Sequence, residues 1–167
     1  IINATNEIIN PFLQSDFGIS IMMAGFFTTV WGIGVVIGGI TGGPLTDRVG
    51  QRRAVEIALA ISFISVVIFS FTPTAAIAWP LVFIFGVAYG YYETVYFAIS
   101  MRKSDPRIAA SMFSILMAIA NIGTGIGLPI AGLLADGVGF RWTFAIIASL
   151  NLLAIPLLPA IFGKNKK

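Results

Sequence analysis

Long apolar runs separated by short polar segments account for most of the chain. After a shorter stretch at 1–13, the runs cover 20–42, 54–71, 77–100, 108–134 and 142–162. A helix of about 20 apolar residues crosses the hydrocarbon core of a bilayer, and hydrocarbon offers no hydrogen-bond partner to an open strand edge. The pattern therefore predicts an all-α membrane protein with six transmembrane helices, the first of them truncated.

Composition supports a membrane rather than an aqueous environment. Hydrophobic residues make up 57% of the chain and charged residues 10%, with a mean hydropathy of +0.95. Soluble domains carry roughly 25% charged residues. The sequence opens at Ile1 rather than Met with a short apolar stretch, so we expect a truncated chain without a signal peptide.

The basic residues alternate between connectors. Nine of the ten Lys and Arg residues fall on one side of the expected helices: Arg48, Arg52, Arg53, Arg102, Lys103, Arg107, Lys164, Lys166 and Lys167. Only Arg141 falls on the other side. Because basic connectors stay in the cytoplasm, we expect an integral protein of the plasma (inner) membrane with a cytoplasmic C-terminus.

Two segments of the chain resemble each other. GPLTDRVGQR at 43–52 recurs as GLLADGVGFR at 132–141, once after the second run and once after the fifth. The copies would then face opposite sides of the membrane, as three helices followed by an inverted three-helix repeat require. Chance is the alternative, since Gly, Leu and Asp are common in short turns.

The connector GPLTDRVGQRR at 43–53 carries the strongest local motif. It resembles the signature loop of the major facilitator superfamily, which lies between the second and third helices of a half. The matching residues are Gly43, Asp47, Arg48, Gly50, Arg52 and Arg53. An aspartate facing a helix terminus and a paired arginine can latch two helix bundles together. Alternatively these are stop-transfer charges, most readily for the last two arginines.

The resemblance extends over the whole chain in helix number and connector length. It implies that residues 1–167 form a single six-helix domain, one half of a transporter whose other half is missing and would be its partner. The basic tail, and the lack of an Arg in the fourth run, favour the C-terminal half. The segment 140–144 instead resembles a turn frequent in N-terminal halves.

Glu93 is an ionisable residue well inside the fourth run, where an unpaired charge is costly and usually functional. Tyr89, Tyr92 and Tyr96 fall at helical spacings beside it. Since the resemblance implies that the first and fourth helices line the cavity, we expect these four side chains to bind substrate or protons. The alternative is a hydrated Glu93 near the cytoplasmic interface, with Tyr96 in an aromatic belt.

The first stretch carries a polar stripe. Asn6, Glu7 and Asn10 follow Asn3 at helical spacings and form one face of a helix. Such a face is unfavourable in lipid, so we expect it to line the substrate cavity. Equally, the stretch could lie in the outer interface of the membrane.

Glycines recur every four residues in the second run. Gly34, Gly38 and Gly42, like Gly86 with Gly90 and Gly123 with Gly127, are spaced as in helices that pack backbone to backbone. The segment 31–42 superficially mimics a dinucleotide-binding loop, but no strand precedes it. We therefore expect helix packing here and no bound cofactor.

These features predict secondary transport of a small solute by alternating access. Proton coupling through Glu93 is one expectation, while sodium coupling, uniport, symport and antiport stay open. The alternative is a scaffold or receptor with the same fold. Without His or Cys the chain lacks the usual nucleophile and metal-site chemistry, so we expect no enzyme, no metal and no nucleic-acid partner.

Overall fold

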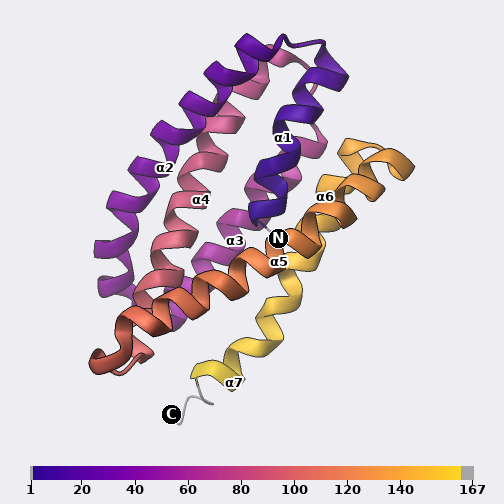
Figure 1. The fold of residues 1–167 in the computed structure, drawn as a ribbon. Helices are drawn as coiled ribbons and strands as arrows, with labels where there is room; N and C mark the ends of the chain where they lie inside the picture. The colour runs from indigo at the N-terminus through magenta and orange to yellow at the C-terminus, as the bar shows by residue number, and fades with distance from the viewer. Residues whose placement is uncertain (1, 163–167) are drawn as a thin grey trace.

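The structure, a computed structural model, describes residues 2–162, and every regular element among them is helical. The helices are α1 (Ile2–Phe17), α2 (Ile21–Val49), α3 (Gln51–Ser70), α4 (Ala75–Lys103), η1 (Pro106–Ile108), α5 (Ala109–Val138), α6 (Phe140–Asn151), η2 (Leu152–Leu157) and α7 (Leu158–Phe162). Figure 1 shows an elongated bundle in which the long helices run between two ends.

Four segments are long and apolar enough to cross a membrane: Ile21–Val49, Gln51–Ser70, Ala75–Arg102 and Pro106–Val138. A shorter apolar helical segment follows at Phe140–Pro156. The all-helical class is thus confirmed, while six crossings and the inverted repeat stay predictions. Lys164, Lys166 and Lys167 lie outside the described residues.

The helices α1 to α5 are longer than the apolar runs from which they were expected. Both connectors that carry the repeated segment, expected at 43–53 and 135–141, are helical except at a single glycine. The second apolar run was expected to end at Gly42 because charged residues follow it. A helix can nevertheless continue beyond the hydrocarbon core, because water and lipid headgroups solvate charged side chains there. The expected loop is therefore one residue, Gly50, between two helix ends.

Gly50 and Gly139 share one backbone geometry. Their φ and ψ values are 83° and 155°, and 82° and 160°, respectively. Each N–H donates to the carbonyl four residues earlier, and each carbonyl accepts from the N–H four residues later. Positive φ favours glycine. The two related segments thus fold alike locally, which supports the internal repeat without establishing its inversion.

α2 and α4 pack backbone to backbone, and they lie side by side in Figure 1. A Cβ built on Gly38 would lie 2.1 Å from the Val87 carbonyl oxygen, and one built on Gly90 would lie 2.1 Å from that of Val35. Contacts advance along both chains together, so the helices are parallel. The expected backbone packing is confirmed for the glycines of α2 and α4. It is wrong for Gly123 and Gly127 of α5, because in the described part of the chain no atom lies within 4 Å of a Cβ built on Gly123, and only the Ala4 Cβ, at 3.6 Å, lies near one built on Gly127.

Four phenylalanines from different helices form the centre of the bundle: Phe12, Phe69, Phe85 and Phe144, each fully buried. Their rings meet at centroid distances of 5.2 Å for Phe12 and Phe144 and 5.8 Å for Phe69 and Phe85. Edge-on aromatic contacts of this kind add to the burial of the rings. They join α1, α3, α4 and α6.

The outer faces of α2 and α5 are apolar. Ile122, Ile126 and Leu133 of α5 are 62%, 61% and 73% exposed, and Ile40 of α2 is 70% exposed. Such faces suit lipid rather than water.

The last run, expected as one span at 142–162, is interrupted. α6 ends at Asn151 and continues as the 3₁₀ segment η2. Pro156 has no N–H, and its ring crowds the carbonyl of residue 152, the residue at which η2 begins. The break therefore has a local cause in the sequence.

We predict that Gly38→Ala destabilises the bundle by about 1–3 kcal/mol, because the new methyl group overlaps the α4 backbone. Gly32→Ala is the matched control on the same helix, since no atom lies within 4 Å of its Cβ position. It should be neutral or stabilising by up to about 1 kcal/mol. Thermal unfolding of the purified protein in detergent measures both, and equal effects would contradict the packing.

Candidate functional site

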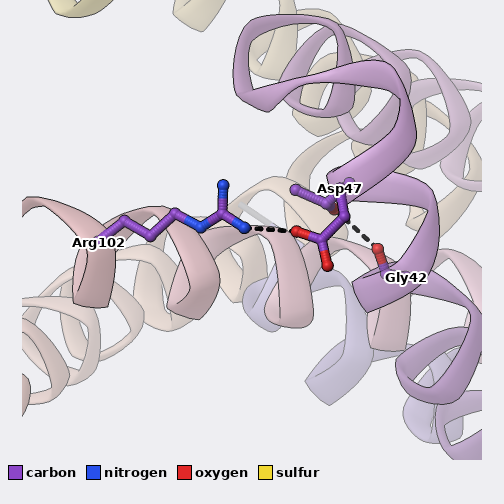
Figure 2. A network of polar contacts seen from close by, with 4 residues as sticks. Gly42, Asp47 and Arg102 are labelled. Atoms are coloured by element: carbon purple, nitrogen blue, oxygen red, sulfur yellow. Dashed lines mark hydrogen bonds and ion pairs between the residues drawn. The ribbon is translucent and has the colours of Figure 1, made fainter.

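Asp47 of the signature motif forms an ion pair with Arg102 (Figure 2). The two residues are 55 positions apart, the same separation as between Thr94 and Gly39, whose hydroxyl and carbonyl are 3.5 Å apart. Parallel helices in fixed register keep such a separation constant. The packing of α2 against α4 therefore brings the aspartate to the last turn of α4.

The rest of the motif surrounds this pair. Figure 2 shows Gly42 one turn earlier on α2, where its carbonyl accepts a 2.7 Å hydrogen bond from the Thr46 hydroxyl. Arg52 pairs with Glu56 at 3.1 Å within α3. Arg48 and Arg53 are exposed and form no ion pair within 2–162. Gly43 has no atom near its Cβ position, so Gly50 alone makes the turn.

A second ion pair lies at the other end of the bundle. Arg141 Nε of α6 is 3.7 Å from Asp16 Oδ2 of α1. Arg141 occupies in the second repeated segment the position of Arg52 in the first. The two segments thus place ionic contacts at opposite ends, although the partner helices differ.

A polar cavity lies between α1, α2 and α4. Its volume is about 230 Å³, and its polar lining is Asn6, Glu7, Asn10, Thr28 and the indole of Trp31. The Asn10 side chain donates to the Thr28 hydroxyl at 3.1 Å. The polar stripe of α1 therefore faces a cavity that α2 and α4 complete.

Trp31 connects this cavity to α4. Its ring meets the Tyr89 ring edge-on at 5.2 Å, and its indole N–H is buried without an acceptor in the described part of the chain. Trp31 thus joins the cavity to the tyrosine that precedes Glu93 by about one helical turn.

Glu93 is half-buried and has neither a cationic partner nor a hydrogen bond among residues 2–162. A carboxylate left unpaired inside an apolar helix is available to a proton, a metal cation or a cationic solute. Glu7 is exposed toward the cavity. The cavity is therefore an acidic, aromatic pocket, and Glu93 is not among its lining residues.

Tyr92 and Tyr96 lie elsewhere. Both line a second, mostly apolar cavity against α3 and the C-terminal segments, and the Tyr96 hydroxyl donates to the Leu116 carbonyl of α5 at 3.4 Å. The structure therefore groups Asn6, Glu7 and Asn10 around one cavity and brings Tyr89 against Trp31 beside it. Glu93, Tyr92 and Tyr96 do not line this cavity.

Sequence reasoning did not single out Arg102, Trp31 or Thr28 as site residues. The sequence could have indicated Arg102, because the glycines that bring α2 and α4 together also determine which α4 residue lies opposite Asp47. Trp31 and Thr28 belong to the site only because α1 packs against α2, and no sequence pattern indicates this helix contact. No three His, Cys, Asp or Glu side chains gather as metal ligands in the described part of the chain.

A family model described as Major Facilitator Superfamily matches residues 2–167. Multidrug resistance protein 3 of Bacillus subtilis (strain 168) is 31% identical over 130 residues, which are 76% of this chain and 25% of that protein.

Multidrug resistance protein MdtG of Salmonella typhimurium is 26% identical over 140 residues, which are 84% of this chain and 35% of that protein. The chain thus spans about a quarter to a third of the length of these curated relatives.

We predict a measurable but small coupling between Asp47 and Arg102, because both side chains are more than half exposed. A double-mutant cycle of Asp47→Asn and Arg102→Gln on thermal unfolding should give about 0.2–1 kcal/mol at low salt and less at high salt. Asp47→Asn with Arg107→Gln is the control cycle and should show no coupling. A coupling energy of zero in the first cycle would contradict an ion pair between Asp47 and Arg102.

Proposed function

Because the chain belongs to the Major Facilitator Superfamily, we propose that it forms part of a secondary transporter that moves a small solute across the membrane by alternating access. Family membership and the names of its relatives support membrane transport, and they favour a transporter over an enzyme. The apolar helices make the chain an integral membrane protein.

The observation that carries the proposal is the acidic cavity between α1, α2 and α4. Polar and charged side chains are unfavourable in hydrocarbon unless they serve a partner. Here Asn6, Glu7 and Asn10 converge on one volume with Trp31. A bilayer-spanning bundle that concentrates its polar groups in this way is suited to binding a solute between its helices.

The substrate class we propose is an aromatic or hydroxyl-rich organic cation. The Trp31 ring lines the cavity, and aromatic faces attract cations. Glu7 supplies an opposite charge, and Asn6 and Asn10 supply hydrogen bonds. The relatives are named multidrug resistance proteins, which is compatible with a pocket that relies on rings and charge rather than on a fixed hydrogen-bond pattern.

In alternating access, the ion pairs at the two ends of the bundle would open and close in turn. Asp47 with Arg102 and the Gly50 turn would hold one end, while Asp16 with Arg141 would hold the other. Exposed pairs of this kind are weak enough to break and re-form as the cavity changes sides. The positions of the motif residues support a gate at the first of these ends.

The topology we propose follows from charge. Residues 1–167 would form one six-helix half, the C-terminal one, with the other half of the same polypeptide completing the cavity. The basic end would face the cytoplasm of the plasma (inner) membrane, together with the C-terminus. Proton coupling through Glu93 is supported by the absence of a cationic partner for its carboxylate among the described residues.

We predict that Glu93→Gln abolishes gradient-driven uptake while leaving the fold intact, because the amide keeps the shape of the side chain but cannot exchange a proton. The assay uses the full-length gene product that contains this chain in vesicles that enclose DNA. Ethidium entry then reports as fluorescence under an imposed pH gradient. Glu7→Gln should weaken uptake of the cation with and without the gradient.

Glu56→Gln is the matched control, since Glu56 pairs with Arg52 at the bundle end, away from the cavity. It should transport like the parent protein. Unchanged gradient-driven uptake by Glu93→Gln would contradict a role of Glu93 in proton coupling. If the parent protein takes up ethidium no faster than protein-free vesicles do, the proposal of transport is contradicted.

A further inference from the structure

A second cavity of about 280 Å³ lies between α3, α4 and the C-terminal segments η2 and α7. Its walls are almost wholly aliphatic and aromatic, and neither Glu7 nor Glu93 lines it. Val55, Ile99 and Ala154 in its wall are only partly buried, so it opens on the outside of the bundle. The transport site does not account for this cavity.

The helix break near Pro156 forms the wall of this cavity that faces α3 and α4. Because α6 gives way to η2 at Leu152, the chain turns so that Ala154, Leu158 and Phe162 line the cavity instead of continuing one straight helix. Figure 1 shows this segment leaving the axis of α6 before α7.

The cavity lies near the basic end of the bundle. Val55 and Leu59 follow the start of α3 at Gln51 by about 6 and 12 Å along the helix axis. Ser100 lies three residues before the end of α4 at Lys103. A molecule filling the cavity would therefore extend into the headgroup region at this end.

Positive charge dominates that region. Arg52 precedes Val55 by three residues, so it lies on the same face of α3, between the cavity and the start of that helix. Arg48 and Arg53 are exposed at the same end and form no ion pair among residues 2–162. The acidic groups at this end each have a partner: Asp47 pairs with Arg102, Glu56 with Arg52, and Asp105 accepts from the N–H of Arg107. The Arg52–Glu56 pair is partly exposed to solvent and therefore weak enough for a phosphate to compete for the guanidinium.

We propose that this cavity binds an anionic phospholipid, with an acyl chain between α3, α4 and α7 and the phosphate headgroup at the Arg52 end. Apolar walls that open laterally suit an acyl chain, and basic pockets between helices at the cytoplasmic face bind anionic headgroups. A cationic solute would find no carboxylate here. The bound lipid fills the space left by the broken helix and ties the C-terminal segment to α3 and α4.

Native mass spectrometry of the full chain in neutral detergent tests the site. After incubation with phosphatidylglycerol or phosphatidylcholine, the chain should retain phosphatidylglycerol at least about fivefold better, the ratio expected for one basic contact. Arg52→Gln should bring this ratio close to one, whereas Arg107→Gln, at the start of α5, should leave it unchanged.

Ala154→Phe fills the cavity and should abolish retention of either lipid, and Val55→Phe should do the same from the α3 wall. Ala60→Phe is the matched control, since Ala60 is exposed on α3 and does not line the cavity. Helical circular dichroism checks that each variant folds.

Three results would overturn the proposal. Lipid retention by both cavity-filling variants would place the lipid elsewhere. Equal retention of the two lipids by the parent chain would remove headgroup recognition. Loss of a dimer in the cavity-filling variants, without bound lipid in the parent, would assign the cavity to a second copy of the chain.

Discussion

Close packing of α2 against α4 is the constraint on which the other features depend. At Gly38 and Gly90 the backbones approach so closely that any side chain larger than hydrogen would overlap the opposite helix. In lipid, where apolar burial gives little drive for helices to associate, such backbone contact supplies the attraction. The same contact fixes the register that places Asp47 opposite Arg102 and brings Trp31 against Tyr89.

The bundle distributes polarity as a membrane protein with a binding cavity should. Its outward faces on α2 and α5 are apolar, its centre is filled by phenylalanine rings, and the polar stripe of α1 faces a cavity between α1, α2 and α4. Charges gather at the two ends, where water reaches them. Ion pairs at these ends are weak individually, which suits contacts that must open and close.

Hydropathy was sufficient to predict the helical class, and glycine spacing predicted close packing for α2 and α4, because both depend on properties of single helices. Which helix packs against which was not predicted. Helix ends were predicted less well. The loop expected at 43–53 is a one-residue turn, since Thr46 and Asp47 can continue a helix in the interface, and the break near Leu152 follows from Pro156 rather than from any change in hydropathy.

The candidate site was predicted only in part, for a geometric reason. Helical spacing places Tyr89, Tyr92, Glu93 and Tyr96 on neighbouring parts of one surface, but α2 and α3 approach that surface from different sides. Tyr89 consequently faces Trp31, while Tyr96 faces α5 and the second cavity. Which neighbour lies on which side is a tertiary property that spacing within one helix does not encode.

Sidedness tests the central claim, a membrane-spanning bundle with parallel α2 and α4, most directly. The chain has no cysteine, so single substitutions at Asp16, Arg48, Arg102 and Arg141 can be labelled in sealed vesicles with a membrane-impermeant thiol reagent. Cysteines at positions 48 and 102 should react from one side and those at 16 and 141 from the other. Labelling of 48 and 102 from opposite sides would contradict the architecture and every functional inference built on it.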